Sequence, residues 1–413
     1  MRRIAIALAC TVLATAPGRA ITPSDVDAAA SVASRKVRPV VRFLASERID
    51  GRDNETPESL KARKKLSRTL KWLGDPIQLG VHGVEGYSQH FTQGTTKGTN
   101  LLAVMRGREL PDEYVVVGGH YDHLGTRSNA SGACSNGRAP GGGVCNGATD
   151  NAAGAAAVLA IGRALKELPE PPRRSVVFAL WDAEEDGLVG SYYYVNNPLV
   201  PIAQTVAYVN FDIQGSDLLP TLARTSFAVG PETGGAVLGD IVTAAIHAEA
   251  FGTLPISYIF GQLRSDYANF VAKNVPTVFF SDSTNGCYHT TRDDLDVVDW
   301  AKLEVQSRIG FRTVLALTET DTPPTFAPPN PGLASYDDAV TLRQVFQTAQ
   351  SDLALFPPAD QQVIMATGSK IAQIVLDGPG AFDSSDVTIL LTAALDGIAA
   401  IQRLGCLKPG GTP

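Results

Sequence analysis

Four apolar runs in the middle of the chain lack the alternation of polar and apolar residues that marks a half-exposed strand. They are short and β-rich, and they lie at 114–118, 175–181, 206–211 and 275–280. Such runs are typical of strands covered on both faces, as in parallel sheets. Segments of helical composition separate them, most clearly at 151–168 and 299–318. The pattern predicts an α/β fold with a mostly parallel or mixed central sheet flanked by helices.

The composition on either side of these runs indicates the domain organisation. Acidic, basic and apolar residues recur at helical spacing over 24–74, which predicts a helical lead-in. Prolines at 323–332 predict a stiff linker. Three further helices with apolar stripes are expected at 336–356, 359–377 and 384–404. We therefore expect a main domain at 21–322 and a small helical C-terminal extension, packed against it, at 333–413.

The first 20 residues have the order of a secretory signal peptide. Two arginines precede an apolar stretch at 4–16, and small residues follow it up to Ala20. The apolar stretch is shorter than the roughly 20 residues of a membrane span. We expect cleavage near Ala20 and a secreted or periplasmic protein. The alternatives are a short buried helix and lipid attachment at Cys10.

The net charge argues against two classes of partner. The formal charge is −7, and loss of Arg2, Arg3 and Arg19 with the signal would make it −10. Neither nucleic acid nor an anionic membrane surface is an expected partner of so acidic a protein. Because no later segment has an uninterrupted apolar run of about 20 residues, we expect a soluble mature protein. The oligomeric state does not follow from the sequence.

Four cysteines remain after the signal, an even number in a compartment where disulfides persist. Three pairings are possible. Cys134 with Cys145 is favoured because this bridge would close a glycine-rich loop whose ends are near in sequence. Cys287 with Cys406 follows by elimination.

Histidine and acidic residues follow the apolar runs. Ligands in open α/β sheets bind at the carboxyl ends of the strands, so these side chains can converge there. Imidazole and carboxylate together suit zinc, and two zinc ions need roughly five protein ligands if one carboxylate bridges them. The candidate ligands are His120, Asp150, Glu185, Asp212 and His289.

The first histidine has both a structural and a functional interpretation. Alone, His120 at a strand end is more often a structural histidine than a metal ligand. The spacing His120-Tyr121-Asp122 favours the ligand, because Asp122 can orient the imidazole from behind. His123 lacks such support and is interpreted as a loop residue.

The acidic candidates also have structural alternatives. Asp150 precedes an alanine-rich helix and could be its N-cap. Glu184 and Glu185 could be a solvated acidic pair, although they directly follow a strand. Asp212 ends an apolar strand, so it is the hardest to explain as a surface charge.

Five segments together resemble the zinc aminopeptidases of peptidase family M28. They occur in the family's order, span about half of the chain, and lie at 118–123, 147–154, 184–191, 210–212 and 288–290. The resemblance implies the zinc-exopeptidase (phosphorylase/hydrolase-like) fold. Two departures stand out: Tyr267 replaces the family's histidine, and the interval from Asp122 to Asp150 is long.

The resemblance also implies a role for each site residue. His120 and Asp212 match the ligands of one zinc, Glu185 and His289 those of a second zinc, and Asp150 the bridge. Glu184 matches the general base that activates a zinc-bound water, and Asp122 the carboxylate behind His120. A cis peptide between Asp150 and Asn151 is implied as well.

The activity implied is that of a metallopeptidase with two Zn²⁺ ions that most often removes N-terminal residues from peptides. The motifs do not decide which end of a peptide is cut, so a carboxypeptidase or a deacylase of the same fold is the first alternative. A glutaminyl cyclase would use one zinc, against which the five ligand positions argue. A non-catalytic binding homologue usually lacks a ligand or the base. Cobalt or manganese could replace zinc.

Overall fold

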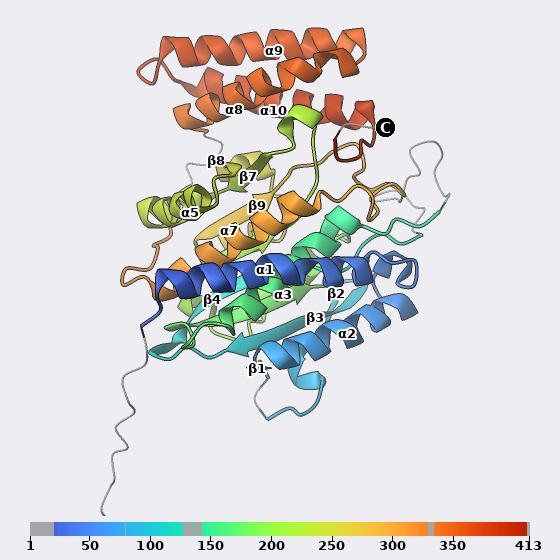
Figure 1. Cartoon of the computed structure of the whole chain (residues 1–413), viewed down its shortest axis with the longest axis vertical. Coiled ribbons are helices and arrows are strands. Elements are labelled where there is room, and N and C mark those ends of the chain that lie inside the picture. The colour runs from blue at the N-terminus through green and yellow to red at the C-terminus, as the bar shows by residue number, and fades with distance from the viewer. Residues whose placement is uncertain (1–19, 79, 127–133, 135–142, 329–333, 411–413) are drawn as a thin grey trace, which may run out of the picture.

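The computed structural model describes residues 20–78, 80–126, 134, 143–328 and 334–410. A mixed sheet crosses the molecule, with the strand order β1-β3-β5-β4-β6-β9-β7-β8 and with β2 beside β3. Figure 1 shows helices packed over this sheet. The strands are β1 (Asp75–Pro76), β2 (Ser88–Gln93), β3 (Thr96–Met105), β4 (Leu110–His120), β5 (Arg174–Trp181), β6 (Thr205–Phe211), β7 (Thr225–Val229), β8 (Gly252–Ile256) and β9 (Thr277–Ser281).

The centre of the sheet consists of the four strands that the apolar runs predict. β5, β4, β6 and β9 are mutually parallel, whereas β1, β2, β3 and β7 add antiparallel pairs. Every residue of β5 is buried, which explains the unbroken apolar run from Val176 to Trp181. The mixed α/β fold is thereby confirmed. The outer strands escaped sequence analysis because polar residues interrupt them, as in Ser88–Gln93.

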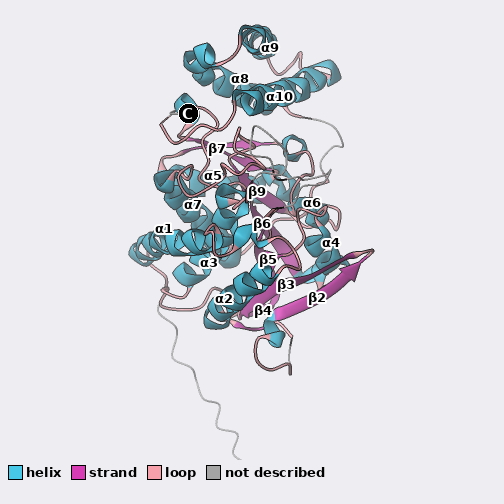
Figure 2. Cartoon of the chain, turned by 90° about the vertical axis from the view of Figure 1, so that its right-hand side faces the viewer, coloured by secondary structure: helices cyan, strands magenta, loops and turns pink. Residues whose placement is uncertain are grey.

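Helices cover both faces of the sheet. α1 (Pro23–Leu44), α3 (Ala153–Leu165) and α7 (Trp300–Glu319) pack together on one face, with α2 (Pro57–Leu73) and α5 (Gly235–Glu249) beside them. The alanines and glycines of α3 let it lie buried on nearly all sides. The short helices α4 (Val189–Asn196) and α6 (Tyr267–Val271) lie on the other face, as Figure 2 shows.

Three more helices, α8 (Tyr336–Ala349), α9 (Pro358–Asp377) and α10 (Ser384–Leu404), form what we call the C-terminal cap. The cap packs against the main domain. Asp338 accepts hydrogen bonds from the backbone N–H and hydroxyl of Ser257, at 2.8 and 2.7 Å. Asp352 binds the backbone N–H and hydroxyl of Thr221 in the same way. α9 and α10 lie where the sequence predicts them, whereas the helix expected at 336–356 ends at Ala349 and is followed by a 3-10 helix at Gln350–Leu355. The boundary of the extension at 333 stays a prediction.

The helix α10 has no uninterrupted apolar run of about 20 residues, as the sequence indicates, yet it is long and apolar overall. By length and composition it is the one helix in the described ranges that could cross a membrane, a test that a core helix also passes. The sequence analysis did not single it out because Asp396 interrupts its apolar sequence, although the helix itself is continuous. In the structure α10 packs on α9 and buries Val387, Leu390 and Ala393.

Both favoured disulfides are confirmed. Cys134 pairs with Cys145, and Cys287 pairs with Cys406, which lies 119 residues further along the chain. The second bridge links the segment after α10 to the loop that follows β9. The expected signal peptide at 1–20 lies almost wholly outside the described residues.

Candidate metal centre

The five candidate ligands and Glu184 come together at the carboxyl ends of the central strands. His120 ends β4, Glu184 and Glu185 follow β5, and Asp212 follows β6. His289 lies in the loop after β9, and Asp150 lies in the turn that leads into α3. Parallel neighbours place these ends at one edge of the sheet, which is why residues from distant segments meet.

Asp150 lies between His120 and His289. One of its carboxylate oxygens, Oδ1, is 3.3 Å from His120 Nε2, and the other, Oδ2, is 3.3 Å from His289 Nε2. His120 Nε2 also lies 3.2 Å from Asp212 Oδ1, and His289 Nε2 lies 3.1 Å from Glu185 Oε2. The arrangement therefore has two halves that share one carboxylate.

The donor atoms fit divalent cations. Three groups of ligand atoms lie within 4.8 Å of one another: His120 with Asp150 and Asp212, His123 with Asp150 and Glu185, and His120 with Glu184 and Glu185. His289 Nε2 is buried, and its contacts with Asp150 and Glu185 lack hydrogen-bond geometry, so it has no hydrogen-bond partner in the described part of the chain. Buried carboxylates are normally paired or coordinate metals, and this mixed nitrogen and oxygen set suits zinc.

Glu184 lies beside the ligands, with Oε2 3.9 Å from His120 Nε2. Burial raises the pKa of Glu184 well above its ordinary value; His120 opposes this shift, and the charges of Asp212 and Glu185 add to it. A bound cation would lower the pKa of Glu184, as His120 does. Glu184 also lines the cavity described below.

Asp122 contacts the turn that carries the two glutamates. Its carboxylate accepts the backbone N–H groups of Glu184 and Glu185, at 3.2 and 3.3 Å. Its Oδ1 is 3.6 Å from His120 Nδ1, which lies nearer to the backbone carbonyl of Asp122, at 3.2 Å. Asp122 thus lies behind His120, and its hydrogen bonds hold the backbone of Glu184 and Glu185.

Asp293, which sequence analysis missed, holds the turn of Asp150. Its carboxylate accepts the backbone N–H and hydroxyl of Thr149, at 2.9 and 2.8 Å, and the backbone N–H of Asp150, at 3.0 Å. Burial raises the pKa of Asp293, and His123 opposes the shift. Its sequence gives no signal, because Arg292-Asp293-Asp294 has the composition of an exposed loop.

Arg52 is a second residue that the sequence did not reveal. Its fully buried guanidinium donates to the backbone carbonyls of Tyr121, at 2.6 Å, and Gly147, at 2.7 Å. It also donates to the carbonyls of Leu44 and Asn146. Burial lowers the pKa of Arg52 to about 10. One side chain therefore ties α1 and the loops of His120 and Asp150 together.

His123 lies in a loop, as interpreted, but it belongs to the site. Its Nδ1 is 2.6 Å from Glu185 Oε1, and its ring lies 5.8 Å from that of His289. The side chain is fully buried, and Nε2 has no hydrogen-bond partner among the residues the structure describes. The sequence offers no spacing that distinguishes His123 from an ordinary loop histidine.

The two remaining family features have clear positions. The peptide bond between Asp150 and Asn151 is cis, as the resemblance implies. Tyr267, which replaces the family's histidine, accepts the backbone N–H of Leu263 at 2.9 Å and donates to the carbonyl of Tyr258 at 3.1 Å. Tyr267 therefore fixes the turn at 258–263.

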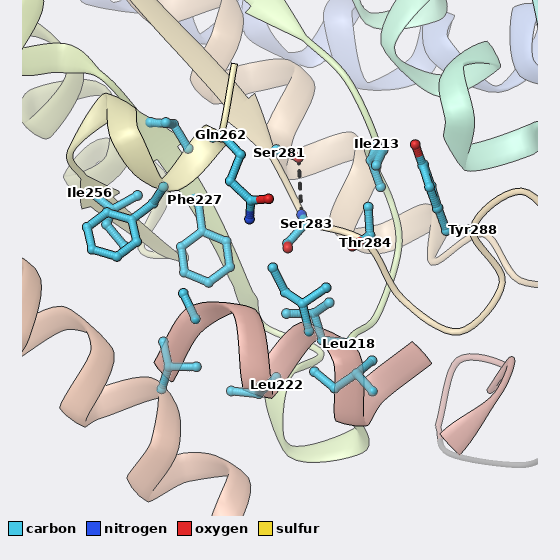
Figure 3. Close-up of a pocket in the computed structure, with 18 of the residues that line it drawn as sticks. Ile213, Leu218, Leu222, Phe227, Ile256, Gln262, Ser281, Ser283, Thr284 and Tyr288 are labelled. Atoms are coloured by element: carbon cyan, nitrogen blue, oxygen red, sulfur yellow. Dashed lines mark hydrogen bonds between the residues drawn. The ribbon is translucent and has the colours of Figure 1, made fainter. Parts of the chain in front are cut away.

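A cavity opens beside the candidate ligands (Figure 3). Asp150, Glu184 and Asp212 line it, and so do apolar residues such as Phe227 and Ile256. The volume of the cavity, including the solvent at its mouth, is about 1310 Å³. Residues of the cap line it as well, so the site extends from the sheet edge to the C-terminal helices.

Known proteins with similar sequences are peptidases. Leupeptin-inactivating enzyme 1 of Streptomyces exfoliatus is 37% identical over 140 residues, which cover 34% of this chain and 28% of that protein. Aminopeptidase NAALADL1 of Rattus norvegicus is 26% identical over 290 residues, covering 62% and 35%. Probable glutamate carboxypeptidase VP8 of Zea mays is 28% identical over 238 residues, covering 53% and 29%. The chain thus spans about a third of these relatives' length.

Solved structures share the fold at low sequence identity. LapA aminopeptidase of Legionella pneumophila matches with a TM-score of 0.57 and 18% identity, covering 78% of this chain and 81% of that one. The aminopeptidase of Aneurinibacillus sp. strain AM-1 matches with a TM-score of 0.54 and 14% identity, covering 74% and 98%. Glutaminyl cyclase of Porphyromonas gingivalis has a TM-score of 0.53 and 19% identity, covering 69% and 97%.

The sequence also matches the model of one protein family. The match to peptidase family M28 extends over residues 100–313, more than half of the 413 residues. It includes all five candidate ligands and Glu184, while the cap lies beyond its end. The chain therefore belongs to peptidase family M28.

Proposed function

We propose that the protein is an aminopeptidase that depends on two zinc ions. The observation that carries this proposal is the position of Asp150, whose two oxygens each lie 3.3 Å from a different histidine. In the proposed assignment His120 and Asp212 would hold one ion, Glu185 and His289 would hold the other, and Asp150 would be shared by both. The three carboxylates contribute −3 against the +4 of two Zn²⁺.

The protein's own groups have separate tasks in peptide hydrolysis. Bound zinc would polarise the scissile carbonyl and lower the pKa of water towards about 7. Glu184 accepts the proton of the attacking water and then delivers it to the nitrogen of the leaving amine. Its burial, with only 8% of its surface exposed, limits exchange of that proton with bulk solvent. Asp122 keeps Glu184 in place through its backbone N–H.

The charges around the cavity favour the amino end of a peptide. Glu184 is the carboxylate of the lining that the proposed assignment leaves free of zinc and able to pair with a protonated amine, and Arg264 is the one cation among the described residues that line the cavity. A pocket for a C-terminal residue needs cations to pair with its free carboxylate. The relatives' names include both aminopeptidases and glutamate carboxypeptidases, so the names do not decide between the two ends.

We also propose that the protein acts outside the cytoplasm. Its two disulfides are compatible with an oxidising compartment. Its substrates there would be peptides with a free amino terminus.

The test compares a short free peptide with its N-acetylated twin, both incubated with zinc-loaded protein and followed by mass spectrometry. We expect stepwise loss of residues from the amino end of the free peptide alone. Trimming from the carboxyl end would replace the proposal with a carboxypeptidase, and cleavage of neither peptide would refute a peptidase.

The variant Glu184→Gln tests the role of the base. It should lower kcat by about 10² to 10⁴-fold, because the proton of the water then has no acceptor. Bound zinc, measured by mass spectrometry of the metal, should remain at the wild-type level. A variant that keeps full activity would remove Glu184 from the mechanism.

A further inference from the structure

The cavity beside the candidate metal centre has walls from two parts of the chain. Its first wall belongs to the main domain and includes Asp150, Glu184 and Asp212. Its second wall belongs to the cap, which lies outside the region 100–313 that matches the family. The cap therefore adds lining residues to this cavity from outside the region that matches the family.

The wall formed by the cap is entirely apolar. It consists of aliphatic and aromatic side chains together with one glycine, among them Leu342, Phe346, Ile364, Gly397 and Ile398. Figure 3 shows Leu218, Leu222 and Phe227 of the main domain near the cap helix, while Tyr288 and Ile213 lie further from it. The cavity thus runs from carboxylates to a region without charged side chains among its described lining.

We propose that the cap closes an apolar subsite for the side chain of the substrate's N-terminal residue, so that the enzyme selects peptides that begin with a large apolar residue. This inference rests on the aminopeptidase function proposed above. The substrate is the expected occupant because the cavity is continuous with Asp150, Glu184 and Asp212. Its space of about 1310 Å³, which includes solvent at the mouth, exceeds the volume of a leucine side chain.

A disulfide bond and several hydrogen bonds hold the cap against the main domain, so its apolar wall can determine specificity. The Cys287–Cys406 bridge attaches the chain just beyond α10 to the loop of His289, two residues after Cys287. Asp338 and Asp352 anchor α8 and the turn after it by hydrogen bonds to Ser257 and Thr221. The cap and the candidate centre are therefore held in a defined relative position.

Gly397 is the position at which the depth of the subsite can be changed. It lies within α10 and lines the cavity, and a Cβ at this position would have Phe346 Cζ at 3.5 Å as its nearest neighbour. A leucine would occupy part of the subsite, and it favours a helix more than glycine does. Gly239 in α5 is the matched control, because a Cβ there would meet nothing within 4 Å.

The experiment measures kcat/KM for alanine, leucine and 2-aminooctanoic acid p-nitroanilides with full-length, zinc-loaded protein. For the wild type, kcat/KM should rise by about fourfold for each added methylene. Gly397→Leu should lower the value for 2-aminooctanoyl anilide by about tenfold or more, the loss of two or more methylene contacts. The same variant should leave alanyl anilide within about twofold, and Gly239→Leu should match the wild type for all three.

A second pair of variants protects the test against misfolding of Gly397→Leu. Ile398→Gln places an amide in the subsite, whereas Leu395→Gln changes a side chain on the same helix that is 51% exposed. We expect only Ile398→Gln to reduce the preference for long side chains. A flat preference in the wild type, or equal effects within both pairs, would overturn the inference.

A binding measurement separates failure of this inference from failure of the proposed function. If none of the anilides is hydrolysed, the aminopeptidase proposal fails, and calorimetry with octan-1-amine and butan-1-amine then tests the subsite alone. The inference predicts tighter binding of the longer amine to wild-type protein and loss of that difference in Gly397→Leu. Equal binding of both amines would overturn it.

Discussion

The carboxylate of Asp293 accepts the backbone N–H of Asp150 at 3.0 Å, and so positions the carboxylate that lies between the two histidines. Groups that orient metal ligands typically contribute 10 to 100-fold to metal affinity. We expect Asp293→Asn to weaken zinc binding by about this factor, because an amide N–H₂ replaces one of the two accepting oxygens. Zinc retained against a graded chelator is the measurement. Asp296→Asn, on an exposed neighbour paired with Lys408, should retain zinc like the wild type.

Removal of His123 should also weaken the site, since Glu185 loses its 2.6 Å partner. We expect His123→Ala to lower zinc affinity and kcat/KM by about 10 to 100-fold. His90→Ala is the control, because that histidine is largely exposed and distant from the centre. Wild-type zinc binding and activity in His123→Ala would show that Glu185 needs no such partner.

Arg52→Met should destabilise the protein strongly. It leaves several buried backbone carbonyls without a donor, and each such group costs about 1 to 3 kcal/mol. We expect the free energy of unfolding, measured in urea with zinc present, to fall by about 3 kcal/mol or more. Arg48→Met, at an exposed position four residues earlier, should change it little. A small effect in both variants would mean that water replaces the guanidinium.

Glu232 should make stability depend on pH. Burial, with a smaller contribution from Asp338, raises its pKa from 4.5 to about 7 in the folded protein. Between these two pH values the folded state binds more protons than the unfolded state, so stability decreases as pH rises from about 4.5 to 7. Glu232→Gln keeps an oxygen that can accept the backbone N–H of Tyr258 and removes this titration.

The decrease in stability across this range should therefore be smaller in Glu232→Gln than in the wild type, by about 2 kcal/mol. Unfolding in urea at a series of pH values measures it. Glu167→Gln, at an exposed position, should follow the wild-type curve. Parallel curves for all three proteins would contradict the raised pKa of Glu232.

The central strands and the candidate ligands could be predicted because both depend on local sequence. Burial on two faces makes a strand such as β5 continuously apolar, and the sheet topology places polar residues after such strands at one edge. Arg52 could not be predicted, because its acceptors are backbone carbonyls up to 98 residues away, those of Gly147 and Asp150 among them. Any residue could supply such a carbonyl, so no sequence pattern marks it.

The cavity illustrates a second limit. The apolar stripes of the last three helices predict that they pack against something, but not that Phe346 and Ile398 face a space beside Glu184. The partner of an apolar face depends on how distant segments are arranged. His123 is a similar case, since only the folded chain brings it to Glu185.

The bridge between Cys287 and Cys406 makes the intervening chain a closed ring of which the cap is a part. A protease that cut once anywhere between these cysteines would open the ring without releasing either piece. Such a nicked molecule would migrate as one species until a reductant was added, and as two fragments afterwards. A single cut in the connection to the cap would therefore leave the cap covalently attached to the rest of the chain.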